Sequence, residues 1–147
     1  RYDIIDAVLS SGIDEPYWIM EKAKILMEQL KSETFKKEVE AFSRVANISI
    51  KATDRPLNRE CLTESSEHAL LRTFEEAKTK YEIAKENEDS YGMYNAITHV
   101  VPQINHFFEH IMVMAEDEKV RNNRLALLKE ISDFIYRFAS FEKIVFA

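Results

Sequence analysis

The sequence from 117 to 145 reads DEKVRNNRLALLKEISDFIYRFASFEKIV. Its apolar side chains recur every three or four residues, the spacing of a helix with one buried face. They are Leu127, Leu128, Ile131, Phe134, Ile135, Phe138, Phe141 and Val145. Asp117 precedes this run, where a carboxylate can accept a hydrogen bond from a free N–H of the first turn. The pattern predicts a long last helix that Asp117 caps and that carries much of the core.

The same period predicts helices earlier in the chain. They are expected at 4–9, from Asp14 to Leu30, from Ser32 to Arg55 before Pro56, and from an N-cap at Thr63 to Asn87. In the second helix, the expected core stripe is Ile19, Ala23, Leu26 and Leu30.

Pro102 interrupts a further helical stretch. Because proline inside a helix removes a hydrogen bond and clashes one turn back, we expect one helix to end near Val100 and another to start near Pro102. A kinked single helix is the alternative. Residues 106–114 are the most apolar in the chain, so they are predicted to form a central core helix.

The composition fits this helical pattern. The chain has 147 residues, 46% of them hydrophobic, with only two glycines and three prolines. So few turn residues argue against many short strands. We therefore expect an all-α fold: residues 1–147 as a single domain, a bundle of about six or seven helices.

Several features bear on the cellular setting. The sequence has neither an apolar run of membrane-spanning length nor a signal peptide, which predicts a soluble, cytoplasmic protein. Cys61 is the only cysteine, consistent with a reducing compartment. The chain begins without Met, directly in a helical pattern, so it is expected to be a piece of a longer protein.

Charge is distributed unevenly along the chain, whose net charge is −6. Residues 36–59 carry six basic and three acidic side chains, and 119–147 also carry six and three, so each block has a charge of +3. Residues 60–118 carry four and thirteen, a charge of −9. A polyanion is expected at the basic blocks, with the acidic block repelling incorrect orientations.

No motif for catalysis is present. A Gly-rich phosphate loop, a Gly-x-Ser-x-Gly elbow and a His-Glu-x-x-His pair are all missing, so the chain is predicted to be non-catalytic. His106 and His110 lie one helical turn apart with His99 nearby, which would suit a metal ion. Ordinary surface or core histidines are the preferred interpretation, and no metal ligand is assigned.

One face of the expected third helix carries the strongest candidates for binding. Arg44, Asn47 and Lys51 fall on its polar side, where a bidentate donor, an amide and a point charge suit reading of bases beside phosphates. A solvated helix face explains the same trio equally well. The other basic members of this face, expected to hold phosphate, are Lys36, Lys37 and Arg55.

A second candidate cluster opens the last helix. Arg121 and Asn122 are expected to point away from the apolar stripe, near backbone N–H groups that favour phosphate. Arg124 falls on the buried side beside Leu128 and Ile131, where a charge must be paired. We therefore expect Arg124 to be a structural clamp on a carboxylate or on helix-end carbonyls.

Four stretches carry a resemblance to a known family. Residues 106–117 (HFFEHIMVMAED) and 121–128 (RNNRLALL) resemble the C-terminal part of bacterial glycyl-tRNA synthetase beta subunits. Residues 1–9 (RYDIIDAVL) and 44–48 (RVANI) are similar to other segments of that family in the same order. The Asp-Ala-Leu-Arg string that names the wider fold is absent, and the nearest match is Asp6-Ala7-Val8-Leu9.

The resemblance implies a DALR-type anticodon-binding fold at the end of a longer beta chain, which recognises the anticodon of tRNA(Gly). It also implies a cytoplasmic glycine–tRNA ligase that uses ATP and magnesium, with its chemistry in an alpha subunit and no cofactor in this domain. The expected partners are tRNA(Gly), the alpha subunit and the rest of the beta subunit, with no DNA and no membrane. The rival interpretations are a subunit-assembly module without base reading and, less favoured, a stand-alone helical enzyme.

Overall fold

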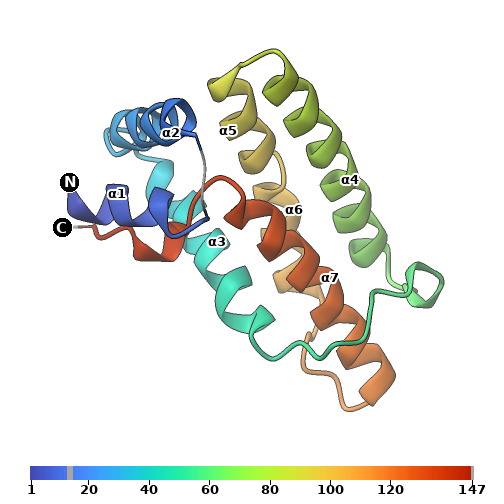
Figure 1. Ribbon diagram of the computed structural model, residues 1–147. Coiled ribbons are helices and arrows are strands. Elements are labelled where there is room, and N and C mark those ends of the chain that lie inside the picture. Colours follow the sequence, from blue (N-terminus) through green and yellow to red (C-terminus); the bar gives the residue numbers. More distant parts are fainter. Residues whose placement is uncertain (13–14, 147) are drawn as a thin grey trace.

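The computed structural model describes residues 1–12 and 15–146, and in these ranges the chain is all-α (Figure 1). The described elements are seven α-helices and two 3₁₀ turns: α1 Tyr2–Leu9, α2 Pro16–Gln29, α3 Phe35–Ser49, η1 Arg59–Cys61, α4 Ser65–Glu86, α5 Ser90–Thr98, α6 Val101–His110, α7 Glu118–Tyr136 and η2 Phe141–Lys143. The expected fold class is confirmed. The expected start of α2 at Asp14 lies outside the described residues, and the helix itself begins at Pro16.

Helix α7 lies across the middle of the molecule between α3 and α4, and α6, which is drawn behind it, contacts both α3 and α4 (Figure 1). Its side chains from Leu125 to Leu128 are buried, and so are Ile131, Phe134 and Ile135. The Phe134 ring packs edge-on against Phe74 and Tyr81 of α4, with centroids 5.6 and 5.5 Å apart. All seven helices contribute to one continuous apolar cluster around this helix.

The two ends of the described chain meet beside α1 (Figure 1). The Val145 N–H donates to the Asp3 carboxylate at 2.8 Å, and Arg1 pairs with the same carboxylate at 2.6 Å. The Ser140 N–H donates to the Ala7 carbonyl at 2.8 Å. The segment after α7 is thereby held against α1, and η2 packs along α3 as well.

Helix α3 is shorter than expected, because it ends at Ser49 and not at Arg55. After it, the N–H groups of Lys51 and Ala52 donate to the carbonyls of Ile48 and Ser49, three residues back. Such bonds tighten and close the last turn of a helix. Lys51 and Arg55 therefore lie on the connector after α3 and not on the helix.

The expected core helix at 106–114 is wrong. Helix α6 ends at His110, and Ile111 has extended backbone angles (φ −120°, ψ 130°). Of this segment, Phe107, Ile111 and Val113 are buried, whereas both histidines, Met112 and Met114 are exposed. Apolar content alone did not indicate where the helix stops. The break at Pro102 is confirmed, since α5 ends at Thr98 and α6 starts at Val101.

Three smaller expectations also need correction. In α2 the expected Leu26 is buried, whereas the expected Ile19, Ala23 and Leu30 are only partly buried against the core. The other buried residues are Trp18, Lys22 and Ile25, because α2 packs on α5 and places Lys22 at the end of α7. The N-cap of α4 is Glu64, not Thr63, and its N–H donates to Glu67 three residues later. Helix α7 stops at Tyr136, so Phe141 is buried from η2, and Val145 is 62% exposed.

In the part of the chain that the structure describes, no helix combines the length and the apolar character needed to cross a bilayer.

Candidate nucleic-acid interface

The outer face of α3 carries the predicted polar stripe. Each side chain of the stripe is exposed: Lys36, Lys37, Glu40, Arg44, Asn47, Lys51 and Arg55. The opposite face of the helix buries Phe35, Val39, Phe42 and Val45 in the core. The 3.6-residue period therefore separates a polar outer face from an apolar inner one, and the two connector residues Lys51 and Arg55 extend it beyond the helix.

A wide, shallow pocket of about 580 Å³ lies on this face. Its polar lining includes Lys36, Glu40, Arg44, Asn47 and Lys51. Its floor and rim come partly from Ile144 and Phe146, which the C-terminal segment brings against α3. The pocket thus places cationic, amide and carboxylate groups around an apolar patch, a combination that suits a flat base beside phosphates.

The cations of the stripe differ from several others in the molecule by lacking protein partners. In residues 1–12 and 15–146, the side chains of Lys36, Lys37, Lys51 and Arg55 form no hydrogen bond or ion pair. Elsewhere, some basic side chains are paired with carboxylates, such as Arg59 with Glu75, Arg137 with Glu82, and Lys143 with Asp6, whereas others, such as Lys24 and Lys80, are exposed without a described partner. What distinguishes the stripe is that several available cations lie together on one face, three of them around the wide pocket, where they can act jointly on an anion.

Arg44 is held in one orientation by an aromatic ring. Its guanidinium carbon lies 4.1 Å from the centroid of Phe108, which projects from α6. Such cation–π contacts contribute about 0.5–1 kcal/mol at exposed sites. The contact positions the guanidinium, and its N–H donors form no ion pair with the residues that the structure describes. Sequence reasoning did not find Phe108 as a member of this site.

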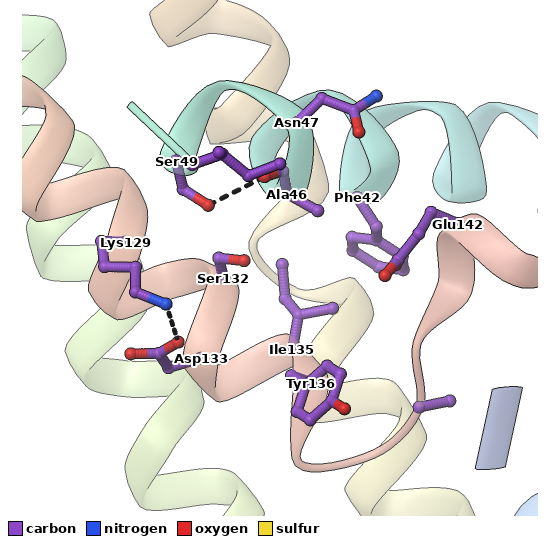
Figure 2. A pocket seen from close by; sticks show the side chains of 12 residues that line it. Phe42, Ala46, Asn47, Ser49, Lys129, Ser132, Asp133, Ile135, Tyr136 and Glu142 are labelled. Atoms are coloured by element: carbon purple, nitrogen blue, oxygen red, sulfur yellow. Dashed lines mark hydrogen bonds and ion pairs between the residues drawn. The ribbon is translucent and has the colours of Figure 1, made fainter. Parts of the chain in front are cut away.

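Asn47 lies between two hollows. It lines the wide pocket on the outer face of α3, and it also borders a second pocket of about 390 Å³ between α3 and α7. Figure 2 shows this second pocket, in which Lys129 and Asp133 of α7 form an ion pair at 2.9 Å. The Asn47 side chain projects away from that pair, toward the outside of α3 (Figure 2). Its amide is therefore presented on the stripe.

Helix α5 is joined to the first turn of α3 by a partly buried hydrogen bond. The Tyr94 hydroxyl donates to Glu38 Oε2 at 2.7 Å. Burial, together with this bond and the charge of Glu38, raises the pKa of Tyr94 well above its usual range. The phenol therefore stays protonated and remains a donor at neutral pH.

The start of α7 differs from the sequence expectation. The Arg121 guanidinium is half-buried and donates to the carbonyls of Ala115 and Glu116, at 3.1 and 3.4 Å. Asn122 does not face away from the core as expected: only 8% of it is exposed, because the connector between α3 and α4 covers the start of α7. Arg55 and Asn122, far apart in sequence, line the same cavity there.

Two residues at this end of α7 have clear structural contacts. Asp117 accepts a hydrogen bond from the Val120 N–H at 3.1 Å and so caps the helix. Arg124 is 9% exposed, donates to the Met112 carbonyl at 2.8 Å and lies 3.6 Å from the Glu67 carboxylate. Arg124 thereby joins α4 to the segment that follows α6. Its Nε has no hydrogen-bond partner among the described residues.

The three candidate histidines lie in two places, His106 with His110 on α6 and His99 beside α4. His99 lies 3.2 Å from Glu76, and His110 contacts the backbone carbonyl of His106 at 2.9 Å, with the two rings 4.1 Å apart. Among the described residues, no group of three or more His, Cys, Asp or Glu side chains could hold a metal ion.

Comparison with known proteins agrees with a nucleic-acid-binding fold. Residues 19–138 match the DALR anticodon binding domain. The chain is 40% identical over 148 residues to the glycine–tRNA ligase beta subunit of Shouchella clausii (strain KSM-K16), a match that covers 100% of this chain and 21% of that protein. It is 35% identical to the protein of that name in Halalkalibacterium halodurans, over 99% of this chain and 21% of the relative. The Bacillus subtilis (strain 168) protein is 30% identical, again over 99% and 21%. The chain spans about a fifth of the length of these curated relatives.

Proposed function

The chain belongs to the DALR anticodon binding domain family, and from this premise we infer that residues 1–147 act as a single domain that recognises the anticodon of tRNA(Gly). The observation that carries the proposal is the stripe of unpaired cations on and after α3, beside the wide pocket. Neutralising phosphates with Lys and Arg is the main source of affinity for RNA. A stripe without carboxylate partners presents that charge without any ion pair having to break.

Side-chain chemistry indicates which residues of the stripe contact phosphates and which contact bases. Lys36, Lys37, Lys51 and Arg55 hold phosphates, which positions the strand but reads no sequence. Glycine codons begin with GG, so the anticodon ends in two cytosines, whose edges offer an amine donor beside nitrogen and carbonyl acceptors. The stripe residues that read this edge are Arg44 and Asn47, which donate to the acceptors, and Glu40, which accepts from the amine.

The start of α7 frames the other side of the anticodon loop. Arg121 shapes the turn before α7 through its bonds to two carbonyls. Asn122 faces the cavity that Arg55 also lines. Arg124 and Asp117 keep structural roles in this proposal, and neither contacts RNA.

The activity of the whole protein is proposed from its relatives. They are named glycine–tRNA ligase beta subunits, so the complete protein is proposed to join glycine to tRNA in the cytoplasm, with ATP and magnesium. The reaction is placed in an alpha subunit. The described domain contributes tRNA binding, and its partners are tRNA(Gly), the alpha subunit and the remainder of the beta chain, with neither DNA nor membrane.

A titration with RNA tests the proposal. The full-length protein is titrated with the tRNA(Gly) anticodon stem-loop at two salt concentrations, beside a stem-loop whose two cytosines are replaced by uracils. We expect binding that weakens with salt and a clear preference for the cytosines. Absence of binding at low salt, or equal affinity for both RNAs, contradicts anticodon reading.

A subunit-assembly function is the second candidate, favoured by one observation. Helices α1 and α2 expose large apolar side chains, among them Tyr2 (96% exposed) and Met20 (72%). Where such side chains form one continuous patch, they mark protein contacts. Because this chain spans only about a fifth of its relatives' length, further polypeptide of the complete protein is available to cover them. Tyr2→Ser with Met20→Ser would then impair assembly of the holoenzyme while leaving the affinity for the stem-loop unchanged.

A further inference from the structure

A cavity of about 680 Å³, separate from the two pockets beside α3, lies between the α3–α4 connector and the start of α7. Arg55, Pro56 and Cys61 line it from the connector, and Lys119, Val120 and Asn122 from α7. Its size suits a small organic group such as a nucleoside. Apolar and polar walls meet in it, and each of its two sides carries one basic side chain.

The walls of this cavity are held in place by defined bonds. Asn123 Oδ1 accepts from the Asn58 N–H at 2.8 Å, and Asn123 Nδ2 donates to the Asn58 carbonyl at 3.0 Å. On the helix side, Asp117 accepts from the Val120 N–H. The cavity is therefore formed before any ligand arrives, which limits the entropic penalty of binding.

Asn122 is the unusual group in this cavity. Only 8% of the residue is exposed, yet its carboxamide has no hydrogen-bond partner among the residues that the structure describes. The carboxamide atoms are not among the fully buried unsatisfied polar atoms of the described residues, so they retain contact with the solvent-accessible space of the cavity and can be reached by a ligand there. The wall of the cavity thus offers an unused donor and an unused acceptor to a ligand.

We propose that this cavity receives one unstacked cytosine of an RNA strand, and that the Asn122 carboxamide pairs with its Watson–Crick edge. The amide offers one donor and one acceptor side by side, and cytosine presents its ring nitrogen and amine in the matching order. Pro56 and Val120 supply apolar surface to the ring. Arg55 and Lys119 contact the flanking phosphates, whereas Asp117, which also lines the cavity, keeps phosphate from its own side.

This inference rests on the proposed function and refines it, since it assigns one base to Asn122 rather than to the α3 stripe. Arg55, the last residue of the stripe, lines the cavity, and Lys51, four residues earlier, lines the wide pocket. The strand would therefore pass from the outer face of α3 along the connector into the cavity. The two cytosines are then read at separate places.

The first test replaces Asn122 with a residue of similar shape and no polar atoms. In the full-length protein, Asn122→Leu should weaken binding of the tRNA(Gly) anticodon stem-loop roughly ten- to hundred-fold, as expected when a bidentate base pairing is removed. Asn95→Leu is the matched control, because Asn95 is exposed on α5, away from the cavity. The unfolding midpoints of both variants check that the fold is retained.

Stem-loops that lack a single base then identify the nucleotide. Removing the base that enters the cavity should weaken wild-type binding but leave Asn122→Leu almost unaffected. Removing either of the other anticodon bases should weaken both proteins equally. If Asn122→Leu binds like the wild type, or if no abasic position distinguishes the two proteins, the assignment is overturned while anticodon binding stands. If the wild type binds no stem-loop at all, both proposals fail.

Cys61 provides an independent readout, since its exposed thiol lines the same cavity. Its alkylation rate is measured from the Cys61 peptide by mass spectrometry, with and without the stem-loop. The RNA should slow alkylation several-fold in the wild type. In Asn122→Leu, at the same RNA concentration, it should have little effect. Unchanged alkylation of the saturated wild-type complex contradicts occupancy of the cavity.

Discussion

The side chain of Asn123 forms two hydrogen bonds with the backbone of Asn58, accepting from its N–H at 2.8 Å and donating to its carbonyl at 3.0 Å. The two residues are 65 positions apart, so this pair fastens the α3–α4 connector to α7. The side-chain amide supplies the acceptor and the donor that the backbone N–H and carbonyl of Asn58 need. It therefore holds an irregular segment that has no helix of its own over most of its length.

Asn123→Ala is expected to lower the free energy of unfolding by about 1–3 kcal/mol, because the substitution removes two partly buried hydrogen bonds. Urea denaturation measures this change. Asn95→Ala, on an exposed position of α5, should change the free energy by no more than about 0.5 kcal/mol. If Asn123→Ala lowers the free energy of unfolding no more than the Asn95→Ala control does, water replaces both hydrogen bonds and the connector does not depend on them.

Arg124 and Glu67 form a buried pair whose members depend on each other. Their side chains are 11% and 3% exposed, with Nη2 and Oε1 3.6 Å apart. Arg124→Met leaves the Glu67 carboxylate buried without its cation, so we expect a decrease of about 3–5 kcal/mol in the free energy of unfolding. The double change Arg124→Met with Glu67→Leu removes both charges and should recover part of that decrease. Additive effects in urea denaturation would contradict the mutual dependence.

The helices were predictable because their signals are local. Apolar side chains at helical spacing and the position of Pro102 depend only on neighbours in the chain, and they located the helices, although α3 and α7 end six and nine residues before the expected Arg55 and Val145. The errors occurred where packing between distant segments determines where a helix ends. Helix α6 stops at His110 although the apolar sequence continues, and the Met112 carbonyl beyond it accepts a hydrogen bond from Arg124 of α7.

In the candidate site, too, some features were predictable from the local sequence and others depend on distant segments. Exposure of the α3 stripe follows from the helical period, so Lys36 and Arg44 could be placed from sequence alone. The ring of Phe108 under Arg44 and the edge formed by Phe146 come from segments far along the chain. The burial of Asn122 likewise depends on a connector more than sixty positions away, and no local pattern reports it.

Asp3 links the two ends of the described chain and should confer acid sensitivity there. Partial burial raises the pKa of Asp3, but hydrogen bonds from Arg1 and the Val145 N–H together lower it by more than burial raises it. The pKa of Asp3 therefore lies below its ordinary value. A carboxyl with a lowered folded-state pKa stabilises the fold fully above its unfolded pKa of about 3.9, and this stabilisation disappears as the pH falls through the folded value. NMR titration of the Asp3 carboxyl should give a midpoint below about 3.9. Arg1→Ala should raise that midpoint, and no change would mean that the arginine does not contribute.

The lysines of α3 should determine how RNA binding responds to salt. For a single strand, each phosphate that a protein neutralises adds about 0.7 to the slope of log affinity against log salt. Lys36→Ala with Lys37→Ala should therefore lower the slope by about 1.4 if each lysine holds one phosphate. The weakening should be equal for the cytosine-bearing and cytosine-replaced stem-loops, because phosphate contacts carry no sequence information. Lys24→Ala with Lys80→Ala is the matched control, since both lysines are exposed, on α2 and α4. An equal decrease of slope in the control would show that the attraction comes from the overall charge of the molecule and not from a phosphate path along α3.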